Sequence, residues 1–191
     1  MSPAAIRPPV GPLAEIIPAP DPAPPLRRPE LALPPWRYLP GHGPHPFRQP
    51  GGHLFTDGSA PRPSPWRVED WEVDGRWGHG LDLFDQRFYW ESHEVVEALW
   101  HNIPRAHPAA GLAQGLIQAA ASVLKRQLGE ARAAQRLHDR AVDRLRLAAE
   151  QLGPRTMGVE LPLTVRELER AASEGGYPLL GRPQSPICWA R

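Results

Sequence analysis

The sequence predicts an all-α fold: a compact bundle of about four to five helices, preceded by a proline-rich irregular arm. The first observation is that 19 of its 26 prolines precede residue 66. Proline has no backbone N–H to donate and breaks both helices and sheet ladders, so this split separates an arm from a foldable body. The second is that apolar residues in the body recur at helical spacing. The third is that no stretch of useful length alternates as a strand would.

These patterns divide the chain into three regions. Residues 1–30 are expected to form a disordered, proline-rich tail with polyproline II character. Residues 31–65 are expected to form an ordered irregular strap, because disordered segments rarely carry large apolar groups such as Trp36 and Tyr38. Residues 66–191 are expected to form the helical bundle domain.

Prolines and glycines mark the first helices of the body. The segment GLDLFDQ fits a short helix, and the stretch YWESHEVVEALWH fits a longer one that runs to about Asn102. Pro104 ends that helix, because the residue before a proline is steered away from helical angles. Pro108 suits the first position of the next helix, for which Gly129 is the stop signal.

Two more helices complete the predicted bundle. One runs from about Glu130 to Leu152 with an apolar stripe along one side. After a short extended piece, the last helix lies within TVRELERAASEGG and ends at Gly175. Thr164 and Glu167 in that segment have the spacing of a capping box.

Charge and cysteine content restrict the class of protein. A net charge of +1 gives no general attraction to nucleic acid or to an anionic membrane. One helix carries a regular arginine row, but Asp139 and Asp143 interleave with it, which favours a solvated, salt-paired face over a nucleic-acid site. The row consists of Arg132, Arg136, Arg140 and Arg144.

Compartment and partners follow from similar arguments. No stretch approaches the roughly 18 apolar residues that cross a bilayer, and the start of the chain does not resemble a signal peptide. Cys188 is the single cysteine, so a reducing compartment fits. We expect a soluble, cytoplasmic protein without a membrane partner. An unknown substrate, a protein partner or further copies of the chain remain open as partners.

The helix containing YWESHEVVEALWH carries the candidate chemistry. His93 and Glu97 lie one turn apart on the stripe of Tyr89, with Trp100 close by. A histidine and a carboxylate at this spacing can chelate one divalent cation, and zinc, iron or manganese suits such ligands. The spacing matches neither the zinc-protease motif nor the Glu-x-x-His motif of di-iron bundles, so a further ligand must come from elsewhere.

The strap histidines are the candidates for that ligand, and His45 or His53 would close the site over the bundle. His138, on a later helix, is a further candidate. Glu94 could then act as the catalytic base that deprotonates a bound water.

Four other residues are expected to support the site. Gln114 and Gln118, with Tyr89 and Trp100, would form its second shell by orienting the ligands or the substrate.

The alternative is a non-catalytic protein. In that case the His, Glu and Gln cluster is a structural polar network that fixes helix register. The chain would be a binding or scaffold module whose first thirty residues face the partner. Signatures of serine hydrolases and of phosphate-binding loops do not occur in the sequence. Whether the protein is an enzyme is left open by the residue pattern.

Two motifs together resemble the bacterial and archaeal family called domain of unknown function 309. They are GLDLFDQRFYWESHEVVEALWH and GLAQGLIQAAASVLKRQLG, and the strap YLPGHGPHPFRQPGGHLF is similar to the lead of longer members. The resemblance covers about residues 34–150. It implies a compact all-α fold and a metal-dependent hydrolase without an established substrate. Many members carry a second carboxylate where this chain has Ala98, so no role for that group is carried over.

Overall fold

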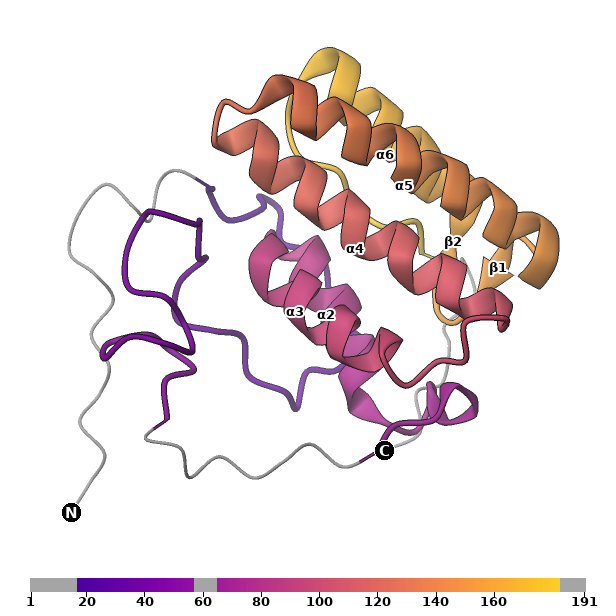
Figure 1. Ribbon diagram of the computed structural model, residues 1–191, viewed down its shortest axis with the longest axis horizontal. Helices are drawn as coiled ribbons and strands as arrows, with labels where there is room; N and C mark the ends of the chain where they lie inside the picture. The colour runs from indigo at the N-terminus through magenta and orange to yellow at the C-terminus, as the bar shows by residue number, and fades with distance from the viewer. Residues whose placement is uncertain (1–16, 57–64, 183–191) are drawn as a thin grey trace.

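The computed structural model describes residues 17–56 and 65–182, and within them the chain forms a helical bundle (Figure 1). The predicted all-α class is confirmed. A 3-10 turn, η1 (Val68–Asp70), precedes the bundle, and a small antiparallel hairpin of β1 (Arg155–Thr156) and β2 (Val159–Glu160) precedes its last helix. The helices are α2 (Gly75–Asp85), α3 (Tyr89–Trp100), α4 (Pro108–Gln127), α5 (Ala131–Leu152) and α6 (Leu161–Glu174).

The long helices α4 and α5 form an antiparallel pair at the centre of the bundle (Figure 1). Helix α3 packs on α4, α2 packs on α3, and α6 packs on α5. Gly115 permits the close approach of α4 and α5, because a Cβ at this position would lie 3.0 Å from Leu145 Cδ2. Gly115 is therefore a point of close contact between α4 and α5.

Local signals explain most helix ends. Helix α3 ends before Pro104, and α4 begins at Pro108, as predicted. His107 caps α4, since its Nδ1 accepts a hydrogen bond of 3.1 Å from the backbone N–H of Ala109. This interaction satisfies one of the amide groups that the first turn of a helix leaves without an intrahelical partner.

The capping box expected at Thr164 is wrong. Helix α6 already begins at Leu161, with Pro162 in its first turn. Thr164 is fully buried; its hydroxyl donates to the Glu160 carbonyl at 2.9 Å and accepts from the Gly181 N–H at 2.8 Å. Proline favours the first positions of a helix, so Pro162 sets an earlier start than the capping pattern indicates.

Residues 17–30, expected to belong to a disordered tail, lie against α2. The backbone N–H groups of Arg27 and Arg28 each donate 2.8 Å hydrogen bonds to the carboxylate of Asp82. Three prolines of this segment also contribute backbone carbonyls that accept hydrogen bonds from the body of the protein. The first sixteen residues lie outside the described residues, and the boundary at residue 30 stays a prediction.

The strap packs on α3 in its described part, residues 31–56. The backbone N–H of Tyr38 donates to Glu91 Oε1 at 3.1 Å, and the ring of Tyr38 meets that of Trp90 edge-on at 5.0 Å between centroids. A tight turn at Gly52 returns the strap toward the helix. A Cβ on Gly52 would collide with the carbonyl oxygens of His45 and Pro46, so no larger residue fits this turn.

Among the residues that the structure describes, no helix is both long and apolar enough to cross a membrane. Cys188, from which a reducing compartment was predicted, lies outside the described residues.

Candidate metal centre and adjoining cavity

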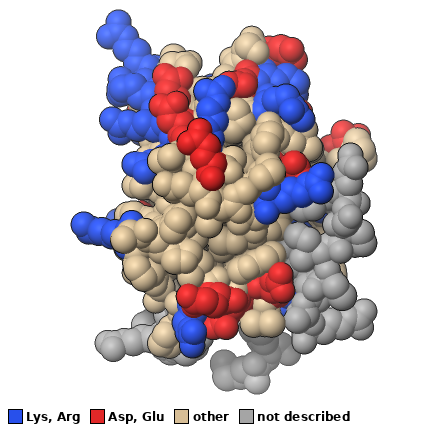
Figure 2. All heavy atoms as spheres, turned by 90° about the vertical axis from the view of Figure 1, so that its right-hand side faces the viewer, with Lys and Arg blue, Asp and Glu red and all other residues tan. Residues whose placement is uncertain are grey.

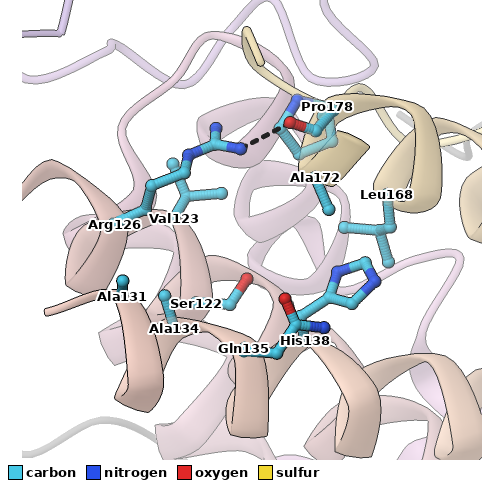
Figure 3. Close-up of a pocket in the computed structure, with 11 residues that line it drawn as sticks. Ser122, Val123, Arg126, Ala131, Ala134, Gln135, His138, Leu168, Ala172 and Pro178 are labelled. Carbon is cyan, nitrogen blue, oxygen red and sulfur yellow. Dashed lines mark hydrogen bonds between the residues drawn. The ribbon is translucent and has the colours of Figure 1, made fainter. Parts of the chain in front are cut away.

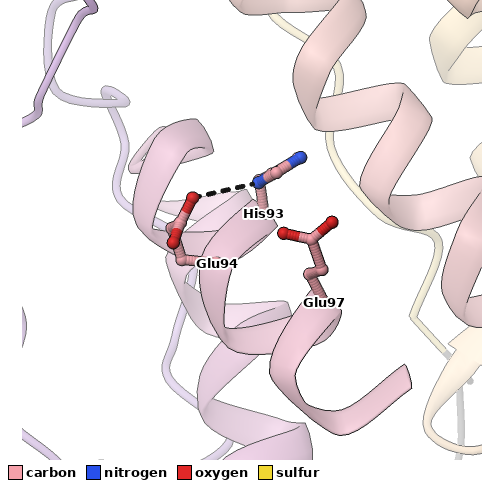
Figure 4. Close-up of side chains that lie close together, drawn as sticks. All are labelled: His93, Glu94 and Glu97. Atoms are coloured by element: carbon pink, nitrogen blue, oxygen red, sulfur yellow. Dashed lines mark ion pairs between the residues drawn. The ribbon is translucent and has the colours of Figure 1, made fainter. Parts of the chain in front are cut away.

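Three side chains of α3 form the candidate metal centre: His93, Glu94 and Glu97 (Figure 4). Each offers a ligand atom, and these atoms all lie within 4.8 Å of one another. His93 Nδ1 lies 3.5 Å from Glu94 Oε1. Within residues 17–56 and 65–182 no other set of three or more His, Cys, Asp or Glu side chains is grouped this closely.

Helix geometry explains the cluster. His93 and Glu97 are four residues apart and share one side of the helix, while Glu94 reaches back toward the imidazole from the adjacent position. The His93 side chain is 25% exposed and that of Glu94 is 33% exposed. A cation held here would therefore keep coordination positions open to water or substrate. One imidazole with two carboxylates is compatible with zinc, manganese or iron.

The structure places the strap histidines with other partners. His45 Nδ1 accepts a hydrogen bond of 3.3 Å from the N–H of Phe47, and its ring packs edge-on against Trp90. His53 Nε2 lies 3.2 Å from Glu91 Oε1. Neither histidine belongs to the group of three, so a ligand role for His45 or His53 has no contact to support it.

Glu91 and His53 form a deeply buried pair between α3 and the strap. Their side chains are 2% and 1% exposed, respectively. The pair lies at ion-pair distance without a well-aligned hydrogen bond, and neither His53 nitrogen has a hydrogen-bond partner. Glu91 Oε2 also lacks a partner. Buried polar atoms in proteins usually have hydrogen-bond partners, so these atoms need an explanation.

A cavity of about 920 Å³ lies beside this pair. It lies between the strap, α2 and α3, and Glu91 and His53 both line it. Glu94 lines it as well, so the candidate metal centre stands at the edge of this cavity. The apolar part of the wall includes Leu31, Leu33, Leu54, Leu83, Val95 and Leu99.

His79 of α2 also lines the cavity. Burial lowers the pKa of its imidazole, and the nearby carboxylates of Asp82 and Glu30 oppose that shift in part. Its Nδ1 is buried and has no hydrogen-bond partner. The imidazole is therefore held toward its neutral form beside the cavity.

The glutamines of α4 make no hydrogen bond to the three side chains of the candidate metal centre among the described residues. Gln114 and Gln118 are half-buried. Gln118 Oε1 is buried without a partner. Their supporting role remains a prediction.

Tyr89 and Trp100 both pack in or against the hydrophobic core. The Tyr89 hydroxyl donates to the Pro178 carbonyl at 3.3 Å, its ring is fully buried, and burial raises the pKa of its phenol. Trp100 packs half-buried on the hydrophobic core. The predicted role of Tyr89 and Trp100 in orienting ligands or substrate stays a prediction.

His138 lines a separate cavity of about 210 Å³ between α4, α5 and α6 (Figure 3). In that cavity Arg126 donates to the Ala171 carbonyl at 2.6 Å, and the Ser122 hydroxyl donates to the Ala119 carbonyl at 2.7 Å. Both polar groups thus have partners on the helices. No cluster of metal ligands includes His138 among the described residues.

The arginine row of α5 is interrupted by acidic residues, as the sequence indicates. Arg132, Arg136 and Arg140 are exposed, and so are Asp139 and Asp143. Figure 2 shows basic and acidic side chains side by side on the face seen from the β1–β2 end, with an uncharged area between them. This distribution does not form the continuous basic surface that nucleic-acid binding requires.

Sequence reasoning missed Glu91 and two carboxylates of α2, Asp82 and Asp85. Each is at most 2% exposed. A signal existed for the aspartates, which stand three residues apart among large apolar residues in GLDLFDQ. A carboxylate embedded in such a stretch predicts a buried group with dedicated partners.

The family model for a domain of unknown function (DUF309) matches residues 77–137. This segment runs from α2 into α5 and contains the three residues of the candidate metal centre. It is narrower than the range of 34–150 suggested by the motifs. Neither the curated proteins nor the solved structures include a match to the chain.

Proposed function

We propose that the protein is a divalent-metal-dependent hydrolase whose metal ligands are His93, Glu94 and Glu97, which lie in the segment that matches the DUF309 family model. The observation that carries this proposal is the close grouping of the three side chains at the edge of the large cavity. Glu94 belongs to both features. A substrate in the cavity would therefore lie next to the ligands.

One histidine and two glutamates are a suitable ligand set for metal-dependent hydrolysis. Catalytic zinc sites typically use three protein ligands and leave a position for water. A divalent cation bound in this way acidifies a water molecule and polarises a carbonyl or phosphoryl oxygen. The partly exposed side chains of His93 and Glu94 leave room for that water. Zinc, manganese and iron are the candidates that one imidazole and two carboxylates suit.

The assignment of Glu94 changes relative to the expectation from sequence. Its position 3.5 Å from His93 Nδ1 favours a ligand over a separate catalytic base. The strap histidines are then not needed to complete the set. Glu91 is a further carboxylate of α3 among the residues that line this cavity, and its side chain is buried.

A purely structural role for the cluster is less well supported. Structural polar networks are normally buried and fully hydrogen-bonded. Here the cluster is partly exposed, and His93 Nδ1 has no hydrogen-bond partner. The non-catalytic scaffold is therefore not favoured by these contacts.

Elemental analysis of the purified protein tests the metal centre. The protein is dialysed without chelator, and wild type is compared with His93→Ala and Glu97→Gln. We expect near-stoichiometric zinc, manganese or iron in the wild type and its loss in both variants. His138→Ala is the matched control, because His138 lines the separate cavity, and it should retain the metal.

Hydrolysis is then assayed on chromogenic carboxylic and phosphate esters, with the chelated protein and after each metal is restored. Activity that returns with the metal in wild type, and not in Glu97→Gln, is the expected result. A metal content that is equal in wild type, His93→Ala and Glu97→Gln contradicts the proposed centre. Metal binding without metal-dependent hydrolysis of any ester contradicts the hydrolase assignment alone.

A further inference from the structure

The cavity between the strap, α2 and α3 has the size and the wall of a site for a small apolar molecule. Its volume of about 920 Å³ lies within the range of roughly 300–1,000 Å³ that ligand pockets occupy. Burial of apolar surface drives binding in such a space. The apolar wall includes side chains of the strap and of both helices: Leu31, Leu33, Leu54, Leu83, Val95 and Leu99.

The strap leaves large apolar side chains exposed at this cavity. Phe47 is 45% exposed and Leu54 is 40% exposed, and both line the cavity. Leu31, Leu33 and Val95 are only half-buried there. An apolar chain in the cavity would remove part of this surface from water, which favours its binding in proportion to the area covered.

The ionisable groups inside this wall do not favour a charged occupant. Glu91 is 2% exposed, and its Oε1 lies 3.2 Å from His53 Nε2. Arg76 Nε donates to Asp74 Oδ1 at 2.9 Å. Burial lowers the pKa of His79, which holds its imidazole toward the neutral form. A charged group that entered the cavity would lose its hydration without a new partner at these residues, so an uncharged occupant is favoured.

Glu94 gives the cavity a polar edge. It lines the cavity, its side chain is 33% exposed, and it belongs to the candidate metal centre. Ala98 follows one turn later on the same side of α3, is exposed, and also lines the cavity. A molecule can therefore have its apolar end among the leucines and its other end beside Glu94.

We propose that the substrate is an uncharged carboxylic ester whose apolar acyl chain lies in this cavity. This inference rests on the proposed hydrolase function, because it places the ester group beside Glu94 and therefore beside the metal ligands. In the reaction, the oxygen of a water molecule bonds to the carbonyl carbon, and the bond from this carbon to the alcohol oxygen breaks. The alcohol oxygen takes up a proton from the water, so the products are a carboxylic acid and an alcohol.

Calorimetric titration of the protein in the presence of chelator tests the cavity apart from the metal. The probes are butanol, hexanol and octanol, which differ only in the length of the apolar chain. We expect the affinity to rise by about two- to fourfold for each added methylene, because each one buries further apolar surface. An affinity that does not depend on chain length overturns the proposal.

Hydrolysis of p-nitrophenyl esters by the metal-restored protein tests the substrate class. The value of kcat/KM should rise at least about fiftyfold from the acetate to the octanoate, because the longer chain adds binding energy in the cavity. The p-nitrophenyl monoester of octanedioic acid has the same chain length but ends in a carboxylate. Because this charge is costly to bury, the monoester should react at least about tenfold more slowly than the octanoate. Equal values for the monoester and the octanoate overturn the uncharged class.

Leu54→Ser tests the strap side of the cavity. It removes an exposed apolar side chain of the wall, so it should weaken octanol binding by about three- to tenfold. Leu147→Ser is the matched control, because Leu147 is 50% exposed on α5 and does not line this cavity. It should bind octanol as wild type does. Equal effects of the two variants overturn the assignment of the chain to this cavity.

Ala98→Trp tests the side of the cavity formed by α3. It places a large ring in the cavity from an exposed position, so the hydrophobic core is not disturbed. It should weaken octanol binding and reduce the preference for the octanoate over the acetate. Ala131→Trp, at an exposed position that lines the separate cavity near His138, should retain both. Unchanged octanol binding in Ala98→Trp overturns the proposal.

The binding and hydrolysis experiments separate this inference from the proposed function. Metal-dependent hydrolysis of the acetate and the octanoate with equal kcat/KM overturns the inference and supports the hydrolase. Octanol binding that is lost in Ala98→Trp, without hydrolysis of any ester, contradicts the hydrolase and the substrate role. That result supports only the preference of the cavity for an apolar chain.

Discussion

Arg27 Nη1 lies 2.8 Å from Asp85 Oδ2 and 3.2 Å from Asp82 Oδ1, so one guanidinium joins two buried carboxylates. The aspartates belong to α2, while Arg27 belongs to the segment that precedes the strap. Asp85 also accepts from Arg182 Nη2 at 2.8 Å and from the Leu180 N–H at 2.7 Å. Helix α2 therefore holds both the N-terminal segment and the segment after α6.

Replacing Arg27 by methionine should strongly destabilise the protein. The Arg27 side chain is 5% exposed and those of Asp82 and Asp85 are 1% exposed. Removing one partner of a buried ion pair leaves an uncompensated charge and costs about 3–5 kcal/mol. The free energy of unfolding in urea measures this loss.

Arg132→Met, on the exposed face of α5, is the control for Arg27→Met. It should change the free energy of unfolding by less than about 0.5 kcal/mol. Equal stability of the two variants would show that the pairing of Arg27 with α2 does not contribute to the fold.

The indole of Trp77 makes a second long-range connection. Its Nε1 donates to the Met157 carbonyl at 2.7 Å and ties α2 to the turn between β1 and β2. Trp77→Phe should therefore cost about 1–3 kcal/mol more than the loss of ring area alone, because the Met157 carbonyl is left buried without a donor.

Trp66 provides the matched control for Trp77. It is also buried and stacks on Trp77, but its Nε1 has no hydrogen-bond partner among the described residues. Trp66→Phe should therefore cost less than Trp77→Phe in urea unfolding. An equal or larger cost for Trp66→Phe would contradict the importance of the bond to Met157.

The sequence predicted the helices better than it predicted the contacts between distant segments. Pro104, Pro108 and Gly129 act on the backbone of their own neighbours, so their effects on helix ends can be recognised locally. The partners of Asp82 and Asp85 lie more than fifty residues away. Nothing in the local pattern indicates which cations they meet.

The same distinction applies to the candidate site. His93 and Glu97 were predicted from their spacing on one helix, and the structure brings them together with Glu94. The positions of the strap side chains were harder to predict from the sequence. The position of His53 depends on a tight turn at Gly52 that only the folded chain defines. The pair of His53 with Glu91 could therefore not be predicted from spacing.

Two glycines of α4 should respond in opposite ways to alanine. At Gly115 a Cβ would lie 3.0 Å from both Cγ and Cδ2 of Leu145, which is fully buried and has little room to move. Gly115→Ala should cost about 1–3 kcal/mol through overpacking.

At Gly111 a Cβ meets no atom within 4 Å. Gly111→Ala should therefore stabilise the protein by about 0.5–1 kcal/mol, because alanine loses less backbone entropy in a helix. Thermal unfolding of the two variants beside wild type checks both signs. Stabilisation by Gly115→Ala would show that α5 can move away from α4.

Burial of His79 should make the stability of the protein depend on pH. Burial lowers the pKa of this imidazole in the folded state, whereas in the unfolded chain it titrates near about 6.5. Below that pH the unfolded chain binds a proton that the folded protein does not, so the free energy of unfolding falls as the pH falls. This contribution is fully present above the unfolded pKa and decreases toward the lower folded pKa.

His79→Gln should therefore flatten the decline in stability between about pH 7 and pH 5, because the variant has no imidazole to protonate at this position. His101→Gln is the control, since His101 is exposed at the end of α3. The midpoints of urea unfolding, measured across this pH range for wild type and both variants, test whether His79 causes the decline. A decline in His79→Gln as steep as that of wild type would mean that other groups cause the acid sensitivity.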